Sequence, residues 1–121
     1  MKVLLIEDDK KLAMAMGIRL KSTGYSVFSA PDAITAMSNA VSFKPDVVII
    51  DINLPGGDGF MVAERLMNSP DTSTTPFIFM TASKKEGLKQ KAMQCGALGF
   101  LEKPFYSSQL TDLLDSSVQD V

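Results

Sequence analysis

The sequence predicts a doubly wound α/β domain, a five-stranded parallel sheet with five helices packed on its two faces. Strand-like and helix-like patterns alternate about five times along the chain, which is typical of this class. The run from Val47 to Ile50 contains no polar residue, and a strand of that kind is buried on both faces, as in a parallel sheet between helices. A length of 121 residues suits a single domain with one core.

In the first part of the chain, the apolar run from Val3 to Ile6 predicts a buried strand. Residues 10–22 carry apolar side chains at helical spacing, and Gly24 supplies the stop. Tyr25 to Ala30 sets two apolar residues between serines, which suggests a shorter strand nearer an edge of the sheet.

The second helix and the central strand come next. Residues 31–42 carry Ile34, Met37 and Val41 at helical spacing, so we expect these three side chains to form the buried face of the helix. Residues 47–51 follow as the central strand, and the strand ends on a carboxylate.

The second half of the chain repeats this alternation. A turn-rich loop over residues 55–59 precedes a helix whose inward side chains should be Phe60, Ala63, Leu66 and Met67. The remaining predicted elements are, in order, a strand over 77–80, a helix over 84–95, a strand over 99–102 and an amphipathic helix over 107–118, with Val118 among its inward residues.

Composition excludes several kinds of function. The chain has no histidine, so no imidazole base, histidine metal ligand or phosphohistidine can come from it. A net charge of −2 gives no general reason to bind nucleic acid. No apolar run is long enough to cross a bilayer, and the single cysteine, Cys95, cannot form an internal disulfide, so a cytoplasmic location is the default expectation.

Polar side chains follow four of the predicted strands. Glu7, Asp8 and Asp9 follow the first, Asp51 closes the central one, Thr81 follows the fourth and Lys103 follows the last. The carboxyl ends of parallel strands meet at one edge of the sheet, where ligands of doubly wound domains bind. We therefore expect these groups to lie together.

The acidic residues would repel one another in such a crevice. Either a raised pKa on one of them or a hard divalent cation relieves this repulsion, and oxygen ligands without histidine or cysteine suit Mg²⁺. The alternative is a solvated acidic cap at the start of the following helix, where the helix dipole favours negative charge. The presence of Asp51 on a neighbouring strand favours the cation.

Thr81 and Lys103 extend this site toward a phosphoryl group. Taken singly, Thr81 could cap a helix and Lys103 could be a structural counter-ion. Together with Mg²⁺ they could neutralise the three equatorial oxygens of a phosphoryl group, with Asp51 as the oxygen nucleophile. Phosphoryl transfer needs little beyond such positioning and charge neutralisation.

The ordered set of motifs resembles the receiver domain of two-component response regulators over essentially the whole chain, residues 1–121. The matching segments are Ile6-Glu7-Asp8, Ile50-Asp51, Leu54-Pro55 with Asp58-Gly59, Thr81-Ala82, Gly96-Ala97 and Lys103-Pro104-Phe105. The resemblance implies the flavodoxin-like version of the doubly wound fold. It also implies a cis peptide bond between Lys103 and Pro104.

The resemblance further implies a role for each site residue. Asp51 would be the phosphoacceptor, and Thr81 and Lys103 would bind the phosphoryl oxygens. Mg²⁺ would be held by Glu7, Asp8, Asp51 and the backbone carbonyl of Asn53. Asp9 falls one position beyond the acidic pair and should cap the first helix. Phe100 matches the aromatic residue that turns inward on activation.

Three classes of function compete for this sequence. The first is a phosphorylation-controlled switch, which catalyses only its own phosphotransfer and dephosphorylation and is not otherwise an enzyme. The second is an aspartate-nucleophile phosphatase, but that class expects a second aspartate where this chain has Asn53. The third is a receiver-like interaction module that works without phosphate, although such modules usually lose one of the site residues that this chain keeps.

The resemblance also predicts the partners. The phosphoryl donor would be a sensor histidine kinase or a histidine phosphotransfer protein. The downstream target or output domain would bind the face formed by the helix over 84–95, the strand over 99–102 and the helix over 107–118. Neither direct nucleic-acid binding nor a membrane is expected for this chain. The literal interpretation of its 121 residues is a stand-alone receiver acting through protein contacts.

Overall fold

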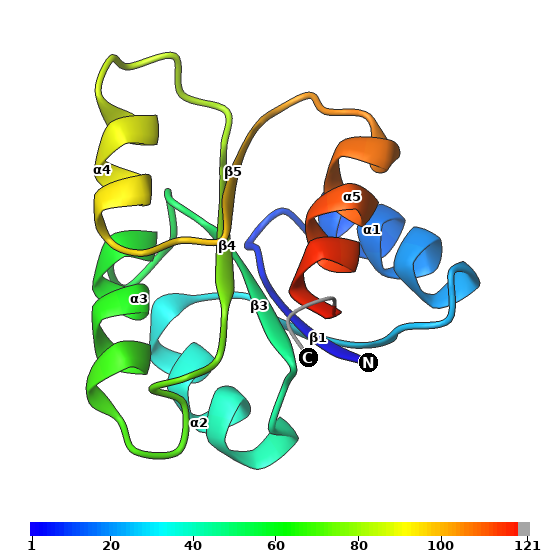
Figure 1. Ribbon diagram of the computed structural model, residues 1–121, viewed down its shortest axis with the longest axis horizontal. Coiled ribbons are helices and arrows are strands. Elements are labelled where there is room, and N and C mark those ends of the chain that lie inside the picture. Colours follow the sequence, from blue (N-terminus) through cyan, green and yellow to red (C-terminus); the bar gives the residue numbers. More distant parts are fainter. Residues whose placement is uncertain (119–121) are drawn as a thin grey trace.

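The computed structural model describes residues 1–118, with side chains described through Ser116. Strands and helices alternate without exception along this part of the chain (Figure 1). The ten elements are β1 (Lys2–Ile6), α1 (Lys10–Ser22), β2 (Ser26–Ala30), α2 (Ala33–Phe43), β3 (Val47–Asp51), α3 (Gly59–Asn68), β4 (Phe77–Thr81), α4 (Leu88–Gln94), β5 (Gly99–Glu102) and α5 (Ser107–Val118).

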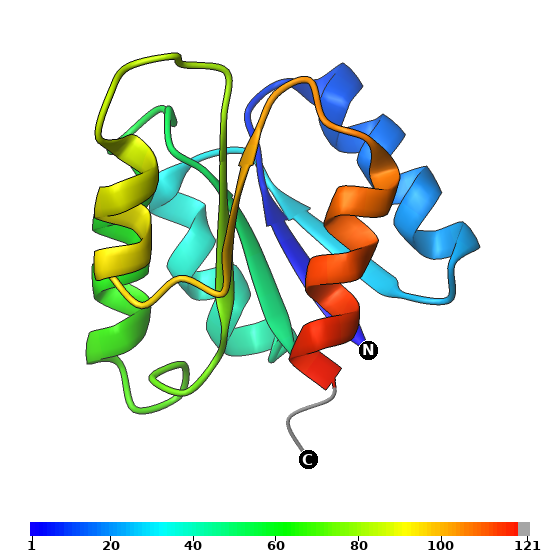
Figure 2. The same ribbon diagram turned by 45° about the horizontal axis from the view of Figure 1, so that its top comes forward.

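The five strands form one parallel sheet in the order β2-β1-β3-β4-β5. Helices α1 and α5 cover one face of the sheet, and α2, α3 and α4 cover the other (Figures 1 and 2). The chain leaves β1 in one direction toward β2 and later returns on the other side of β1 as β3. The boundary between β1 and β3 is therefore the switch point at which domains of this class bind ligands.

The sheet separates two buried clusters, because alternate side chains of each strand point to opposite faces. Leu4, Val48 and Phe79 belong to the cluster under α2, α3 and α4. Val3 and Ile49 belong to the cluster under α1 and α5. Every residue of β3 and β4 is buried, as expected for central strands. The edge strand β2 is mostly exposed, and with five residues it is as long as β1.

The buried face of α2 differs from the predicted one. Its buried residues are Ala33, Ala36 and Ala40, whereas Ile34 and Val41 are exposed. Small side chains let a helix lie close to the sheet, so the alanine face packs inward and the larger residues border the contact. Met67 of α3 was also predicted to point inward and is exposed, while Val62 of the same helix is buried.

The fourth helix is shorter than predicted. It begins at Leu88, because Gly87 takes a left-handed conformation (φ 85°) that interrupts any earlier helical turn. Lys84 and Lys85 therefore lie in the preceding loop. The side chain of Val118, predicted to pack inward, lies outside the described side chains. Within residues 1–118, no helix combines the length and the apolar character needed to cross a membrane.

Candidate functional site

The centre of the site is Asp51, the last residue of β3, at the switch point of the sheet. The residue is buried, with 4% of its surface exposed. One carboxylate oxygen, Oδ1, accepts a hydrogen bond from the backbone N–H of Asn53 at 2.9 Å. The start of α3 packs against the same strand end, because the N–H of Gly59 donates to the carbonyl of Ile52 at 2.7 Å. A Cβ atom on Gly59 would lie 2.6 Å from the carbonyl oxygen of Asp51, so only glycine fits there.

Lys103 joins the two buried carboxylates. Its Nζ lies 2.6 Å from Oδ2 of Asp51 and 2.8 Å from Oε2 of Glu7. Burial lowers the pKa of this ammonium, but hydrogen bonds to the two carboxylates and their negative charges together raise it above its ordinary value. The peptide bond that follows, between Lys103 and Pro104, is cis, as predicted.

Glu7 is almost completely enclosed, with 3% of its surface exposed. The pKa of Glu7 is raised to about 7, first by burial and then by its interaction with Asp51, although the hydrogen bonds from Lys103 and from the N–H of Asp9 oppose the rise. One of the two predicted ways to relieve the repulsion among the carboxylates, a raised pKa, is therefore present in this arrangement.

The acidic residues divide into a cluster and a helix cap. Glu7, Asp8 and Asp51 each place a carboxylate oxygen within 4.8 Å of the others. Asp9 turns away and caps α1, where its Oδ1 accepts hydrogen bonds from the N–H groups of Lys11 and Leu12. Among the described residues the cluster offers three convergent carboxylate oxygens and no histidine or cysteine, a set that fits a hard cation such as Mg²⁺.

Thr81, Asn53 and Phe100 lie at different depths. Thr81 ends β4 and is fully buried, and its hydroxyl oxygen accepts a hydrogen bond from the N–H of Ser83 at 3.0 Å. Asn53 is exposed beside Asp51. Phe100 lies on β5, partly buried against the cluster under α4, and it borders a small groove with Leu88 and the loop before α4.

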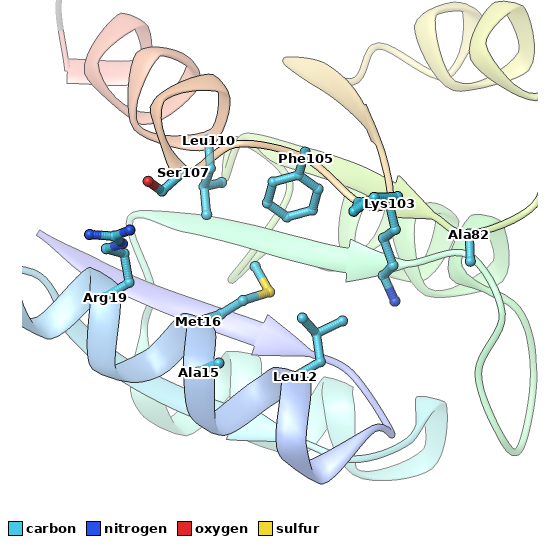
Figure 3. A pocket seen from close by; sticks show the side chains of 10 residues that line it. Leu12, Ala15, Met16, Arg19, Ala82, Lys103, Phe105, Ser107 and Leu110 are labelled. Carbon is cyan, nitrogen blue, oxygen red and sulfur yellow. The ribbon is translucent and has the colours of Figure 1, made fainter.

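An open cavity of about 550 Å³ adjoins the site between α1 and α5. Figure 3 shows Lys103 at one end of the cavity and Arg19 at the other, with Leu12, Met16 and Leu110 between them. Lys103 thus lines this cavity and also contacts the acidic cluster.

The receiver-domain model of response regulators matches residues 3–115. The chain belongs to the response regulator receiver family. It is 35% identical over 104 residues to the DNA-binding dual master transcriptional regulator RpaA of Synechocystis sp., a match that covers 86% of this chain and 43% of RpaA. This receiver chain therefore spans less than half the length of that relative.

Solved structures of receiver proteins superpose closely on the chain. The chemotaxis response regulator CheY4 of Vibrio cholerae aligns with a TM-score of 0.86 and 29% identity, over 96% of this chain and 97% of that one. The BeF3-activated receiver domain of Klebsiella pneumoniae RstA aligns with a TM-score of 0.91 over 99% and 100% of the two chains; at 22% identity it shows the shared fold alone.

Sequence reasoning missed two features of this receiver's site. It did not predict that Lys103 bridges both Glu7 and Asp51, because residues on different strands give no pairwise signal. It treated Gly59 as part of a turn, whereas the residue allows α3 to approach the backbone of Asp51. The Asp58-Gly59 pair was the available signal, since Asp58 caps α3 through a 2.8 Å hydrogen bond from the N–H of Met61.

Proposed function

We propose that residues 1–121 form a receiver domain that accepts a phosphoryl group on Asp51 and thereby changes its protein-binding surface. The observation that carries this proposal is the 2.6 Å contact between Lys103 and Asp51 beside the carboxylates of Glu7 and Asp8. A buried carboxylate held by an ammonium and facing a candidate cation site has the charge balance that a transferred phosphoryl group needs.

In the proposed reaction, an oxygen of Asp51 attacks the phosphorus atom of the donor. The new P–O bond forms as the bond between phosphorus and the donor's leaving group breaks, and the electrons of that bond stay with the leaving group. The N–H of Asn53 orients the attacking carboxylate. The Lys103 ammonium would exchange its contact with Asp51 for one with a phosphoryl oxygen. The hydroxyl of Thr81 would bind another phosphoryl oxygen after a short movement.

Mg²⁺, held by Glu7, Asp8, Asp51 and the carbonyl of Asn53, would supply the remaining neutralisation of charge on the phosphoryl group. The oxygen-only donor set and the exposure of Asp8 suit this ion, which keeps several of its water ligands. The same residues would support slow hydrolysis of the aspartyl phosphate by the receiver itself.

The donor must come from outside the chain, because the chain has no histidine. We propose a sensor histidine kinase or a histidine phosphotransfer protein as the donor, and a cytoplasmic location for the exchange. The downstream target or output domain would bind the face formed by α4, β5 and α5. The relatives differ in their named outputs, which are transcription for RpaA and chemotaxis for CheY4.

Phosphorylation of Asp51 can be tested directly. The protein is incubated with acetyl phosphate and Mg²⁺, and the modified residue is mapped by mass spectrometry. We expect one added phosphoryl group on Asp51, lost after chelation of the metal and in Asp51→Asn. Label that persists in Asp51→Asn would contradict the assignment, and a folded protein that takes no label from any donor would favour the phosphate-independent interaction module.

A further inference from the structure

The loop that follows Asp51, residues 52–58, determines how the acceptor carboxylate is oriented. The Asn53 N–H holds Oδ1 of Asp51, and the carbonyl of Ile52 is fixed by the N–H of Gly59. A shift of the loop backbone would therefore move the hydrogen-bond donor of Asp51 directly. Contacts that hold the loop backbone in place therefore also orient the carboxylate of Asp51.

The middle of the loop rests on the first turn of α2. The N–H of Ala33 donates to the carbonyl of Pro55 at 3.1 Å. The first N–H groups of a helix have no partner within the helix, so this bond satisfies one of them. One residue later, a Cβ atom on Gly56 would lie 2.9 Å from Cγ1 and 3.1 Å from Cδ1 of Ile34, which shows that the Ile34 side chain lies directly against the loop backbone.

The other side of the loop is held by α3. A Cβ atom on Gly57 would overlap the Cε atom of Met61 and would lie 3.6 Å from Cβ of Ala33. Gly56 and Gly57 both have positive φ, 79° and 140°, which are conformations that favour glycine. The loop thus passes between the first turns of α2 and α3, with a side chain against each glycine.

The segment that leads into α2 is hydrogen-bonded to the backbone of Glu7. The N–H of Glu7 donates to the carbonyl of Ala30 at 3.0 Å, and only two residues separate Ala30 from the start of the helix. Asp32 caps α2 through a 2.7 Å hydrogen bond from the N–H of Thr35. The position of Ile34 is therefore fixed relative to Glu7 as well as to the loop.

Ile34 has no evident role in the core. Ile34 is 73% exposed, so it buries little surface in the core. Its side chain does lie against the backbone of Gly56. Its contact is therefore with the loop that follows Asp51, where it can affect the position of the loop backbone.

We infer that Ile34 is a positioning residue for phosphoryl transfer to Asp51: it holds Gly56, and through the loop backbone it holds the Asn53 N–H on the acceptor carboxylate. The inference rests on the proposed function, because it names a further residue of that site. Ile34 touches neither the phosphoryl group nor the metal, and its effect passes through the backbone of residues 53–56.

The experiment compares Ile34→Ala with Ile18→Ala. Ile18 is a matched control, because it is an isoleucine on a helix surface with 64% exposure and lies on α1. The first readout is hydrogen exchange of the Asn53 amide in metal-free protein, followed by NMR. We expect this amide to exchange faster in Ile34→Ala and to be unchanged in Ile18→Ala, since exchange reports the opening of the hydrogen bond to Asp51.

The second readout is the rate of phosphorylation by acetyl phosphate as a function of Mg²⁺ concentration. We expect Ile34→Ala to lower the rate at limiting Mg²⁺ by about tenfold, the size of effect common for residues that support a metal site from outside. Ile34→Val keeps Cγ1, the atom nearest Gly56, and should retain most of the rate. Gly56→Ala should impair the wild type more than it impairs Ile34→Ala, because the added Cβ meets the Ile34 side chain.

Failure of this inference differs from failure of the proposed function. If the wild type takes up label on Asp51 and Ile34→Ala matches Ile18→Ala in both readouts, Ile34 has no positioning role. Additive effects of Gly56→Ala and Ile34→Ala would also overturn it. If the wild type takes up no label, the proposed function fails, and the exchange rate of the Asn53 amide still decides whether Ile34 holds the loop.

Discussion

Among the single residues of the site, Lys103 balances the charge of the buried carboxylates. Its ammonium contacts two carboxylates that are 3% and 4% exposed, and each of these carboxylates would be costly to bury alone. The pKa of Glu7 is raised mainly by burial and by its interaction with Asp51, whereas the pKa of Lys103 is raised by its two carboxylate partners against the effect of burial. A phosphoryl group on Asp51 would give the ammonium a new anionic partner.

The two exposed aspartates after β1 should have separable roles. Asp8→Ala removes a carboxylate from the cluster, so we expect it to abolish Mg²⁺-dependent phosphorylation by acetyl phosphate with little loss of stability. Asp9→Ala removes the cap of α1, so we expect it to lower the free energy of unfolding by about 1 kcal/mol and to leave phosphorylation largely intact. Urea denaturation and phosphorylation assays on both variants measure these effects. A greater loss of phosphorylation in Asp9→Ala would show that the metal ligands are assigned one position too early.

The positions of three site residues in the fold could be predicted from the sequence because each lies at, or directly after, the end of a strand. Asp51, Thr81 and Lys103 are placed by the topology alone, since parallel strands deliver their carboxyl ends to one edge. Contacts between side chains from different elements could not be predicted. The Lys103 bridge to Glu7 and the Ile34 contact with Gly56 depend on the three-dimensional path of the loops, which local pattern does not determine.

Among the connections between secondary-structure elements, the one between α3 and β4 contains a polar residue that is buried as part of the core. Thr72 is 3% exposed, and its hydroxyl donates a 2.7 Å hydrogen bond to the carbonyl of Leu66 in the last turn of α3. The last carbonyls of a helix lack the usual helical partner, and the Leu66 carbonyl is satisfied by this hydroxyl together with a longer, 3.4 Å hydrogen bond from the N–H of Ser69. The polar composition of residues 69–76 alone suggests only a solvated loop.

Thr72→Val should therefore destabilise the fold. The substitution keeps the shape of the side chain and removes the shorter of the two hydrogen bonds to the Leu66 carbonyl, so we expect the free energy of unfolding to fall by about 1 kcal/mol. Thr74→Val is the matched control, because Thr74 is exposed in the same loop, and it should change stability by less than about 0.5 kcal/mol. Equal midpoints of urea unfolding for the two variants would show that the Thr72 hydrogen bond contributes nothing measurable.

The strands were more predictable than the helices for a physical reason. A strand buried on both faces is apolar at every position, as β3 is, and its pattern leaves no choice of face. A helix such as α2 has two apolar stripes, one of small and one of large side chains, and the sequence does not show which lies against the sheet. The start of α4 was misplaced because the conformation of Gly87 follows from the loop and not from helical periodicity.

At the scale of the whole molecule, β4 and β5 provide a route from the site to a distant surface. Phe79 pairs with Phe100 and Thr81 with Glu102, so Thr81 and Phe100 point to the same face of the sheet from diagonal positions. A movement of Thr81 toward a phosphoryl group would open space on that face, and the partly buried ring of Phe100 could turn into it. Phenylalanine has no hydroxyl, so the inward state leaves no polar group buried.

This route predicts how the molecule responds to a phosphoryl mimic. Beryllofluoride with Mg²⁺ should change the NMR signals of the Phe100 ring and of amides in residues 84–110, because the ligand favours one of two arrangements of this region. The same addition to Asp51→Asn should leave those signals unchanged.

The cation–π contact between Lys91 of α4 and Phe60 of α3, with Nζ 4.2 Å from the ring centre, should limit how far these changes extend along α4. Signals near this contact should change less than those of residues 82–88, since α4 is held to α3 there and its N-terminal end is preceded by a loop. Changes confined to the loops around Asp51, with Phe100 unaffected, would mean that Thr81 does not connect the phosphorylation site to the face formed by α4, β5 and α5.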